Sequence, residues 1–233
     1  LLLFDCGQAR QSVLDPNYFP KGLIGFLYGR LAKFEIGSDD TLSNRLATLG
    51  HKLDQVKLVV MSHLHQDHIG GLSELKHADI IVSEEEWKQL SKPIPEMDGF
   101  LTRHIDIPGL KWKRISPNGT SDQSIAPFTA SYDVFGDGSL VLLPTPGHTA
   151  GSISLLIRKS EIPPMLLVGD VTYDINLLKN ERLPGVGDRK SLLQTTRNIN
   201  ALKQKYPDLM ILASHDPAAV DILKNSNRQL HKE

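Results

Sequence analysis

Cysteine is almost absent from this sequence, and its scarcity excludes a covalent framework. The one cysteine, Cys6, stands in the apolar run Leu-Leu-Leu-Phe-Asp-Cys at the start of the chain. A single cysteine has no intramolecular partner, so disulfides within the chain cannot stabilise the fold. We expect Cys6 to be a buried, inert thiol, because free cysteine behaves as a small apolar side chain.

An excess of charge of either sign is also missing. Lys plus Arg number 26 and Asp plus Glu number 27, which gives a formal net charge of -1. Such a balance creates no long-range field that would attract nucleic acid or an anionic membrane. We therefore expect neither of these as a partner, and a small-molecule substrate instead.

Long apolar runs are missing as well. No run reaches the roughly 18 residues of a membrane span, and no basic-then-apolar leader precedes Leu1. The chain nevertheless begins without Met and inside a strand-like run, so we expect its natural N-terminus to lie upstream. A cytoplasmic location is expected, and secretion stays open because the natural N-terminus is expected to lie upstream of this sequence.

Short apolar runs typical of buried strands alternate with helical patterns along the chain. We expect strands at Leu1–Cys6, Val56–Met61, Ile80–Val82, Thr129–Phe135, Leu140–Leu143, Ser152–Ile157, Met165–Val168 and Met210–Ala213. Helices are expected over Leu42–Leu49 with Asp39 or Asp40 as the cap, through Leu72 and Leu75, after a Ser83/Glu86 capping box, over Lys190–Lys205, and from Pro217. This order predicts an α/β protein in which sheets pack together under outer helices. We expect a single domain over residues 1–233, and whether it consists of two packed halves stays open.

The strongest motif is His63-x-His65-x-Asp67-His68, directly after the expected strand Val56–Met61. On an extended stretch His63 and His65 project to the same side, and a turn can bring Asp67 and His68 to a second point nearby. Imidazole nitrogens and carboxylate oxygens are ligands suited to zinc and similar divalent ions. Three histidines and an aspartate within six residues therefore predict a metal site.

Three further candidate ligands each follow an apolar run. They are His148 after Leu140–Leu143, Asp170 after Met165–Val168, and His215 after Met210–Ala213. Seven ligands exceed what one tetrahedral ion needs, but they suit two ions that share a carboxylate. The division we expect is His63, His65 and His148 on one ion, Asp67, His68 and His215 on the other, and Asp170 as the bridge.

These residues resemble the metallo-β-lactamase superfamily, whose HxHxDH motif is followed by a later GH, a later D and a final H. The resemblance extends from Asp5-Cys6-Gly7 to His215. It implies the αββα sandwich, with two sheets packed together, helices outside, and a dinuclear centre at the sheet edges. Zinc is the metal it implies first, with manganese, cobalt or iron as alternatives.

Within that superfamily the chain is similar to the N-acyl-homoserine lactone lactonases. The stretch from Ser62 to Gly71 matches their SHLHxDHxGG form, and Tyr173 follows Asp170 by three residues as in that group. The resemblance implies a quorum-quenching lactonase in which a metal-bridging hydroxide attacks the lactone carbonyl. Tyr173 would then donate to the carbonyl oxygen, and Asp67 or a metal-bound water would protonate the leaving alkoxide.

Alternatives remain open at this stage. Another hydrolase could use the same centre: a thioesterase of the glyoxalase II kind, a β-lactamase or a phosphodiesterase. A non-catalytic binding scaffold is the alternative from a different class, and its signature would be missing ligands. The segment Gln8–Gly37 carries apolar residues such as Phe19 and Phe26 among prolines and glycines. It predicts either a pocket wall for an acyl chain or a homodimer contact.

Overall fold

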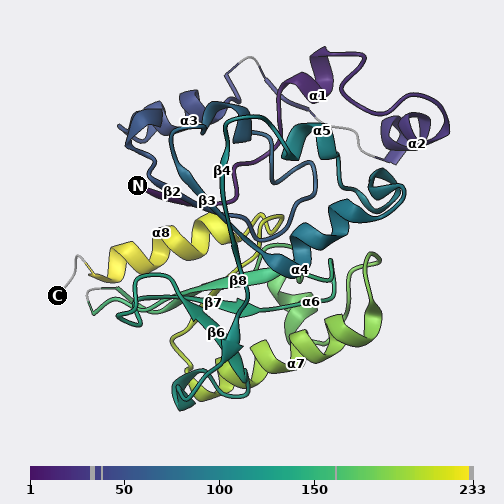
Figure 1. Ribbon diagram of the computed structural model, residues 1–233. Helices are drawn as coiled ribbons and strands as arrows, with labels where there is room; N and C mark the ends of the chain where they lie inside the picture. Colours follow the sequence, from purple (N-terminus) through teal and green to yellow (C-terminus); the bar gives the residue numbers. More distant parts are fainter. Residues whose placement is uncertain (32–34, 38, 161, 231–233) are drawn as a thin grey trace. The chain divides into compact units, whose positions relative to one another are not determined.

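The computed structural model describes residues 1–31, 35–37, 39–160 and 162–230, and their contacts form two compact units (Figure 1). The first unit comprises residues 1–82 and 87–114, and the second comprises residues 83–86 and the described residues from 115 onward. Part of the segment Gln8–Gly37, residues 32–34, lies outside the described residues. Among the described residues, no helix has the length and apolar character that crossing a bilayer requires.

A four-stranded sheet with the order β1-β2-β3-β4 organises the first unit. Its strands are β1 Leu2–Phe4, β2 Leu58–Val60, β3 Asp79–Ser83 and β4 Lys111–Ile115. The first three strands are parallel, so their carboxyl ends lie at the same edge of the sheet. Asp5, just past β1, donates its backbone N–H to the carbonyl of Val60 at the end of β2. This pairing brings the Asp5 turn beside the loop that carries the HxHxDH motif.

Short helices and 3-10 turns connect these strands. The helices are α1 Gln11–Leu14, α2 Leu23–Leu31, α3 Leu42–Thr48, α4 Glu84–Trp87 and α5 Thr102–Ile105, and the turns are η1 Leu53–Gln55, η2 Leu72–Glu74, η3 Lys88–Ser91 and η4 Pro95–Asp98. Val59, Leu72 and Ile80 are fully buried in one apolar cluster that joins the sheet to this layer.

Two sequence predictions for the first unit were wrong in detail. Thr41, rather than Asp39 or Asp40, caps α3, because its hydroxyl lies where it accepts the Asn44 N–H, while the Asp40 carboxylate accepts the Gly37 N–H. The expected helix through Leu72 and Leu75 is the single 3-10 turn η2. Few residues separate η2 from β3 at Asp79, so the chain has no room for a longer helix.

A six-stranded sheet with the order β10-β9-β8-β7-β6-β5 organises the second unit. Its strands are β5 Asn118–Gly119, β6 Ala130–Asp133, β7 Leu140–Pro144, β8 Ile153–Ile157, β9 Met165–Leu167 and β10 Met210–Leu212. β9 and β10 are parallel, whereas β8 is antiparallel to both β7 and β9. β7, β9 and β10 therefore point the same way, and their carboxyl ends meet at one edge. The predicted hairpin of β6 and β7 is confirmed.

The helices of the second unit are α6 Ile175–Lys179, α7 Arg189–Lys205 and α8 Ala219–Leu230, and a 3-10 turn, η5, covers Gln123–Ile125. Along α7, Leu192, Ile199 and Leu202 recur on one stripe and pack in the same cluster as the sheet residues. Helix α8 begins at Ala219 and not at Pro217, because the Asp216 side chain accepts the Ala218 N–H and holds Pro217 in a turn.

Candidate metal centre

The first unit holds one half of the candidate centre in the loop after β2. His63 and His68 are buried, and their ring centroids lie 4.0 Å apart. The His65 ring lies 4.6 Å from His63, edge to face. Asp67 is partly exposed, with one carboxylate oxygen 3.9 Å from Nε2 of His68. The motif thus gathers its three imidazoles and its carboxylate within this unit.

Asp5 orients two of these histidines. Its carboxylate accepts the Ser62 N–H at 2.6 Å, the Ser62 hydroxyl at 2.7 Å, and lies 2.8 Å from Nδ1 of His68. A carboxylate only accepts, so Nδ1 of His68 carries the proton and Nε2 keeps its lone pair. Because the Ser62 hydroxyl donates to Asp5, it accepts from Nδ1 of His63 at 2.9 Å, which leaves Nε2 of His63 as the ligand atom. Asp5 has a φ of 62°, and such a left-handed conformation is uncommon outside glycine and concentrates at functional positions.

His65 is oriented by a different segment. Its Nε2 lies 3.0 Å from the carbonyl oxygen of Asp98, at the end of η4, so Nε2 donates and Nδ1 is the available ligand atom. Gly99 follows with a φ of 94°, and a Cβ there would lie 2.6 Å from Cδ2 of His65. Only glycine allows the backbone to approach the ring this closely.

The two glycines of the DHxGG stretch have a comparable reason. A Cβ on Gly70 would lie 2.1 Å from the Ala9 backbone nitrogen, and a Cβ on Gly71 would lie 3.1 Å from the carbonyl oxygen of Cys6. Cys6 is buried, as predicted, and burial raises the pKa of its thiol far above its ordinary value. The turn that carries Asp5 therefore packs directly against the end of the metal motif.

The second unit holds the other half at the carboxyl ends of β7, β9 and β10. His148 and Asp170 are buried, and Nε2 of His148 lies 3.5 Å from Oδ2 of Asp170. Nε2 of His215 lies 3.4 Å from the same oxygen. Ligand atoms that converge in this way on one carboxylate oxygen are what a shared metal ligand requires.

The loop that carries His148 is held against α7. A Cβ on Gly147, whose φ is 144°, would lie 2.6 Å from the Leu192 backbone nitrogen. The Asp188 N–H donates to the Gly147 carbonyl at 2.7 Å, and the side chain of Asp188 caps α7 through the Ser191 N–H. Glycine before His148 is thus required by the close contact with the first turn of α7.

Tyr173 lies in the same half. Its ring centroid lies 5.4 Å from that of His215 and 6.3 Å from that of His148, edge to face in both cases. The adjoining backbone is tied to the His215 loop, because the Ile175 N–H donates to Oδ2 of Asp216 at 2.9 Å. The tyrosine side chain is partly exposed beside the candidate ligands.

The donor set fits divalent metal ions. In the first half, Ser62, Asp5 and the Asp98 carbonyl each hold one nitrogen of a histidine and leave the other nitrogen as a ligand atom, which is the usual arrangement around bound zinc. In the second half, two imidazoles share one buried carboxylate. His63, His65, Asp67, His68, His148, Asp170 and His215 are all candidate ligands.

The sequence did not identify the supporting residues. In the sequence, Asp5 marks only the start of the family resemblance, and Asp98 and Gly99 belong to none of the motifs. Ser83 does accept the Glu86 N–H, as the capping box predicts, but the Glu86 carboxylate binds the loop of His148. An aspartate in the left-handed region leaves no local pattern, so sequence alone had little means of finding these roles.

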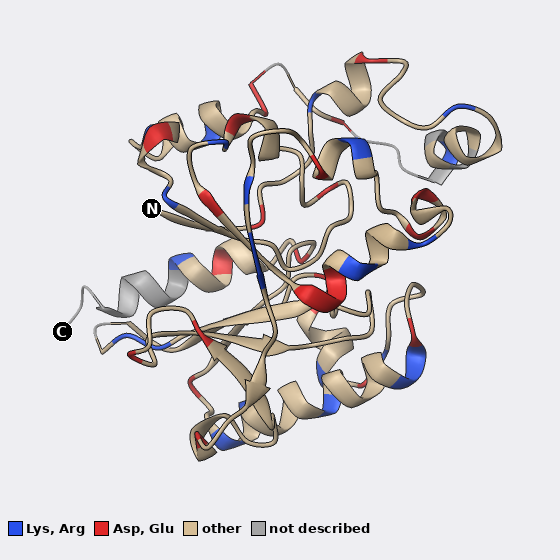
Figure 2. Ribbon diagram, in the orientation of Figure 1, with Lys and Arg blue, Asp and Glu red and all other residues tan. Residues whose placement is uncertain are grey.

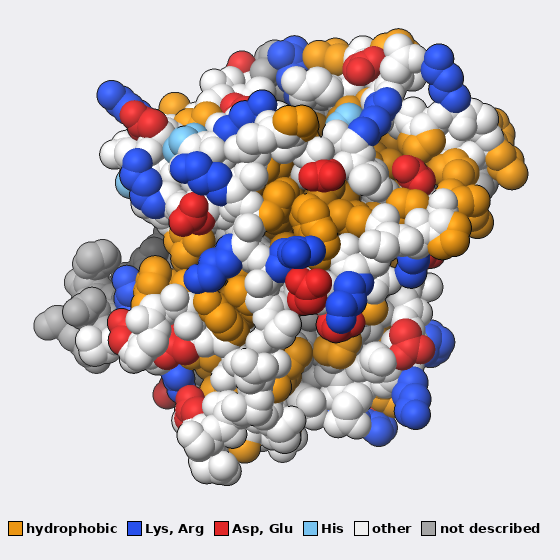
Figure 3. Space-filling view, viewed as in Figure 1, with side chains coloured by type: hydrophobic (Ala, Val, Ile, Leu, Met, Phe, Trp, Pro, Cys, Tyr) orange, Lys and Arg blue, Asp and Glu red, His pale blue; other side chains and the backbone are white. Residues whose placement is uncertain are grey.

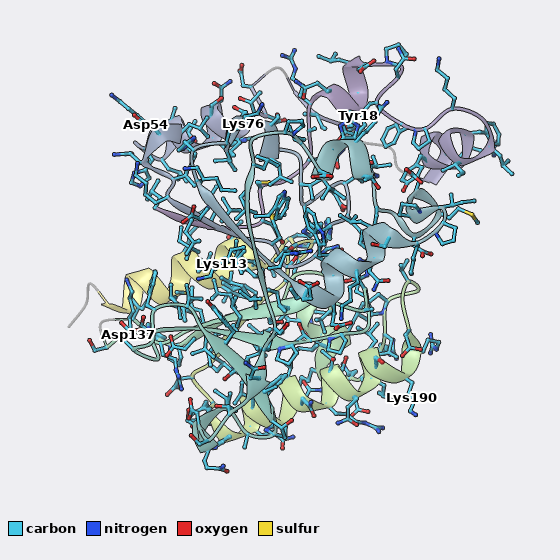
Figure 4. The ribbon with its side chains drawn as sticks, viewed as in Figure 1. Tyr18, Asp54, Lys76, Lys113, Asp137 and Lys190 are labelled. Carbon is cyan, nitrogen blue, oxygen red and sulfur yellow. The ribbon has the colours of Figure 1, made fainter. Side chains whose placement is uncertain are left out.

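The segment Gln8–Gly37 is in part core and in part surface. Tyr18 is buried and stacks on His104 of α5 at 4.1 Å, and burial raises the pKa of Tyr18 to about 12 (Figure 4). Leu23 and Phe26 of α2 are 74% and 59% exposed. Figure 3 shows hydrophobic side chains gathered on the face of the molecule that is in view. Figure 2 shows basic and acidic residues spread over many elements, with an acidic run at the start of α4. A pocket wall or a dimer contact stays a prediction for the exposed part.

Known proteins agree with this architecture. Residues 26–215 match the family model described as the metallo-beta-lactamase superfamily. The chain is 33% identical over 221 residues to the N-acyl homoserine lactonase AttM of Rhizobium radiobacter, an alignment that covers 93% of this chain and 78% of that protein.

Two solved structures are similar in fold. The first is an N-acyl homoserine lactone hydrolase with N-hexanoyl-L-homoserine at its catalytic metal centre, with a TM-score of 0.72, 23% identity, and coverage of 94% of this chain and 78% of that one. The second is the dizinc quorum-quenching lactonase AidC, with a TM-score of 0.61, 18% identity, and coverage of 93% and 68%. The fold class expected from the sequence is confirmed. The chain belongs to the metallo-beta-lactamase superfamily and is a metal-dependent hydrolase.

Proposed function

We propose that this protein is a dinuclear metal hydrolase that opens the lactone ring of N-acyl-homoserine lactones, and so acts in quorum quenching. The observation that carries the proposal is its likeness to a curated lactonase along nearly the whole chain. The candidate ligands of both half-sites and the tyrosine beside His148 and His215 support it.

In this proposal the two half-sites together hold two divalent ions, for which zinc is the first expectation. His63, His65 and His148 would hold one ion, and Asp67, His68 and His215 would hold the other. Asp170 would be the ligand that the two ions share. When bound, such ions lower the pKa of a coordinated water and polarise an ester carbonyl.

The residues of the chain have distinct tasks around that chemistry. Asp5, Ser62 and the Asp98 carbonyl fix which histidine nitrogen faces the metal. The Tyr173 hydroxyl donates a hydrogen bond to the lactone carbonyl oxygen as negative charge develops there. Asp67 would take a proton released by the attacking water and return it to the alkoxide formed when the ring opens, or a metal-bound water would supply that proton.

A panel assay tests the substrate class. Metal-loaded protein is offered an N-acyl-homoserine lactone, a thioester, a β-lactam and a phosphodiester, and we expect the lactone to be hydrolysed with the highest kcat/KM. Exhaustive chelation should abolish turnover, and zinc, manganese or cobalt should restore it. Active protein without transition metal would refute the metal centre, whereas faster thioester or phosphodiester hydrolysis would refute only the lactone assignment.

A further inference from the structure

The buried carboxylate of Glu86 is a feature that the proposed reaction does not use. Glu86 lies at the start of α4 and is 1% exposed. Its Oε2 accepts the Thr149 hydroxyl at 2.7 Å and the Gly151 N–H at 3.1 Å. Both donors lie in the loop that begins with Gly147-His148.

The contact is close as well as polar. The Ser83 hydroxyl donates to the Gly151 carbonyl at 2.6 Å. The segment of residues 83–86 therefore binds the His148 loop at a second point. A Cβ on Gly151 would lie 2.0 Å from the Glu86 backbone nitrogen, and only glycine fits there. These contacts place residues 83–86 in the second unit although the preceding strand belongs to the sheet of the first.

Displacement of Thr149 would move His148, because the loop is tied to itself. The Gly147 N–H donates to the Thr149 carbonyl at 2.9 Å, and these two residues flank His148. The Thr149 hydroxyl also lies 2.6 Å from that of Ser152. A rigid loop of this kind transmits the position of Thr149 directly to the imidazole.

A carboxylate is a costly group to bury, and its hydrogen bonds must offset the loss of hydration. Hydrogen bonds to a buried carboxylate nevertheless fix geometry, since their donors have no equivalent partner when it is removed.

We propose that Glu86 is a positioning residue for the metal ligand His148, acting through Thr149 and Gly151. The inference rests on the proposed metal centre and extends it beyond the direct partners of the ligands. It predicts that Glu86 controls the affinity for the ion held by His148 more than the affinity for the other ion.

The test is a two-step zinc titration of metal-free protein against a chelating indicator, for wild type, Glu86→Leu, Glu86→Gln and Glu85→Gln. We expect Glu86→Leu to weaken the binding of one of the two zinc ions, by up to the roughly 10 to 100-fold that the loss of a direct partner of a metal ligand costs. Glu86→Gln keeps an oxygen that can accept a hydrogen bond, so its zinc affinity should fall less. Glu85→Gln removes the same charge from an exposed neighbour and should bind both ions as wild type does.

Thr149→Val provides a second variant should Glu86→Leu fail to fold, because it keeps the carboxylate and its bond to Gly151 while it removes the hydroxyl that bonds Glu86 and Ser152. It should weaken the same ion, and its effect should not add to that of Glu86→Gln. Wild-type affinity for both ions in folded Glu86 and Thr149 variants would overturn the inference. If wild-type protein itself binds no zinc, the proposed metal centre fails, which is a different result.

Discussion

Replacement of Asp5 by asparagine should weaken metal binding through a change of histidine tautomer. Asparagine tolerates the left-handed backbone of Asp5, whose φ is 62°, so the substitution changes the side-chain chemistry without straining the turn. The carboxylate accepts from three donors: the Ser62 N–H, the Ser62 hydroxyl and Nδ1–H of His68. An amide presents one oxygen and one NH₂ group, so it cannot satisfy all three.

The orientation of the asparagine amide decides what happens to His68. If its oxygen accepts the Ser62 N–H, its NH₂ group faces Nδ1 of His68, which must then accept. The proton moves to Nε2, and the nitrogen that should bind metal has no lone pair available. The opposite orientation places two donors, NH₂ and the Ser62 N–H, against each other. Either arrangement disfavours the geometry that holds a metal.

The expected loss is about 10 to 100-fold in the affinity of one ion, or about 1.4 to 2.7 kcal/mol, which is typical when a partner of a metal ligand is changed. Competition with a chelating indicator measures it, and Asp54→Asn, a change at an exposed aspartate, serves as the control. Unchanged affinity for both ions in Asp5→Asn would refute the tautomer argument. A ¹⁵N spectrum of the histidine rings in metal-free protein reads the tautomer directly.

Three further substitutions test the rest of the site. Asp170→Asn should weaken the binding of both metal ions together, because a neutral amide is a poor shared ligand. Full metal content with full turnover in this variant would exclude Asp170 as the bridging ligand. Tyr173→Phe should lower lactone turnover by roughly 10 to 100-fold and leave the metal content unchanged. The loss should be smaller than for an enzyme whose only oxyanion donor is removed, because the metal also stabilises the negative charge. Phosphodiester turnover should fall less, and equal losses would remove Tyr173 from the mechanism. Gly99→Ala should displace the His65 ring and so weaken metal binding, because the added Cβ would lie 2.6 Å from the ring. A metal affinity near that of wild type would show that the η4 turn shifts and the ring does not.

Local patterns were enough to predict most elements of the sheets and the candidate ligands. Alternating and continuous apolar runs identified the strands other than β4 and β5, which were not predicted. Helix α7 followed from its repeating apolar stripe. The predicted helix after Gly71 was wrong, because the short connection to β3 decides its length and the apolar spacing does not. Four candidate ligands were identified by the HxHxDH motif, and His148, Asp170 and His215 were identified because each lies shortly after the end of a strand.

Tertiary structure alone decided how those ligands are held. Asp5 and His68 are 63 positions apart, as are Glu86 and Thr149, and His65 is 33 positions from Asp98. Contacts at such separations depend on strand order and loop packing, which no local period records. The sequence by itself therefore determined the chemistry, since residue type and strand-end position are local properties. The choice of histidine nitrogen, the closeness of the glycines and the burial of Glu86 arise only when distant segments pack together.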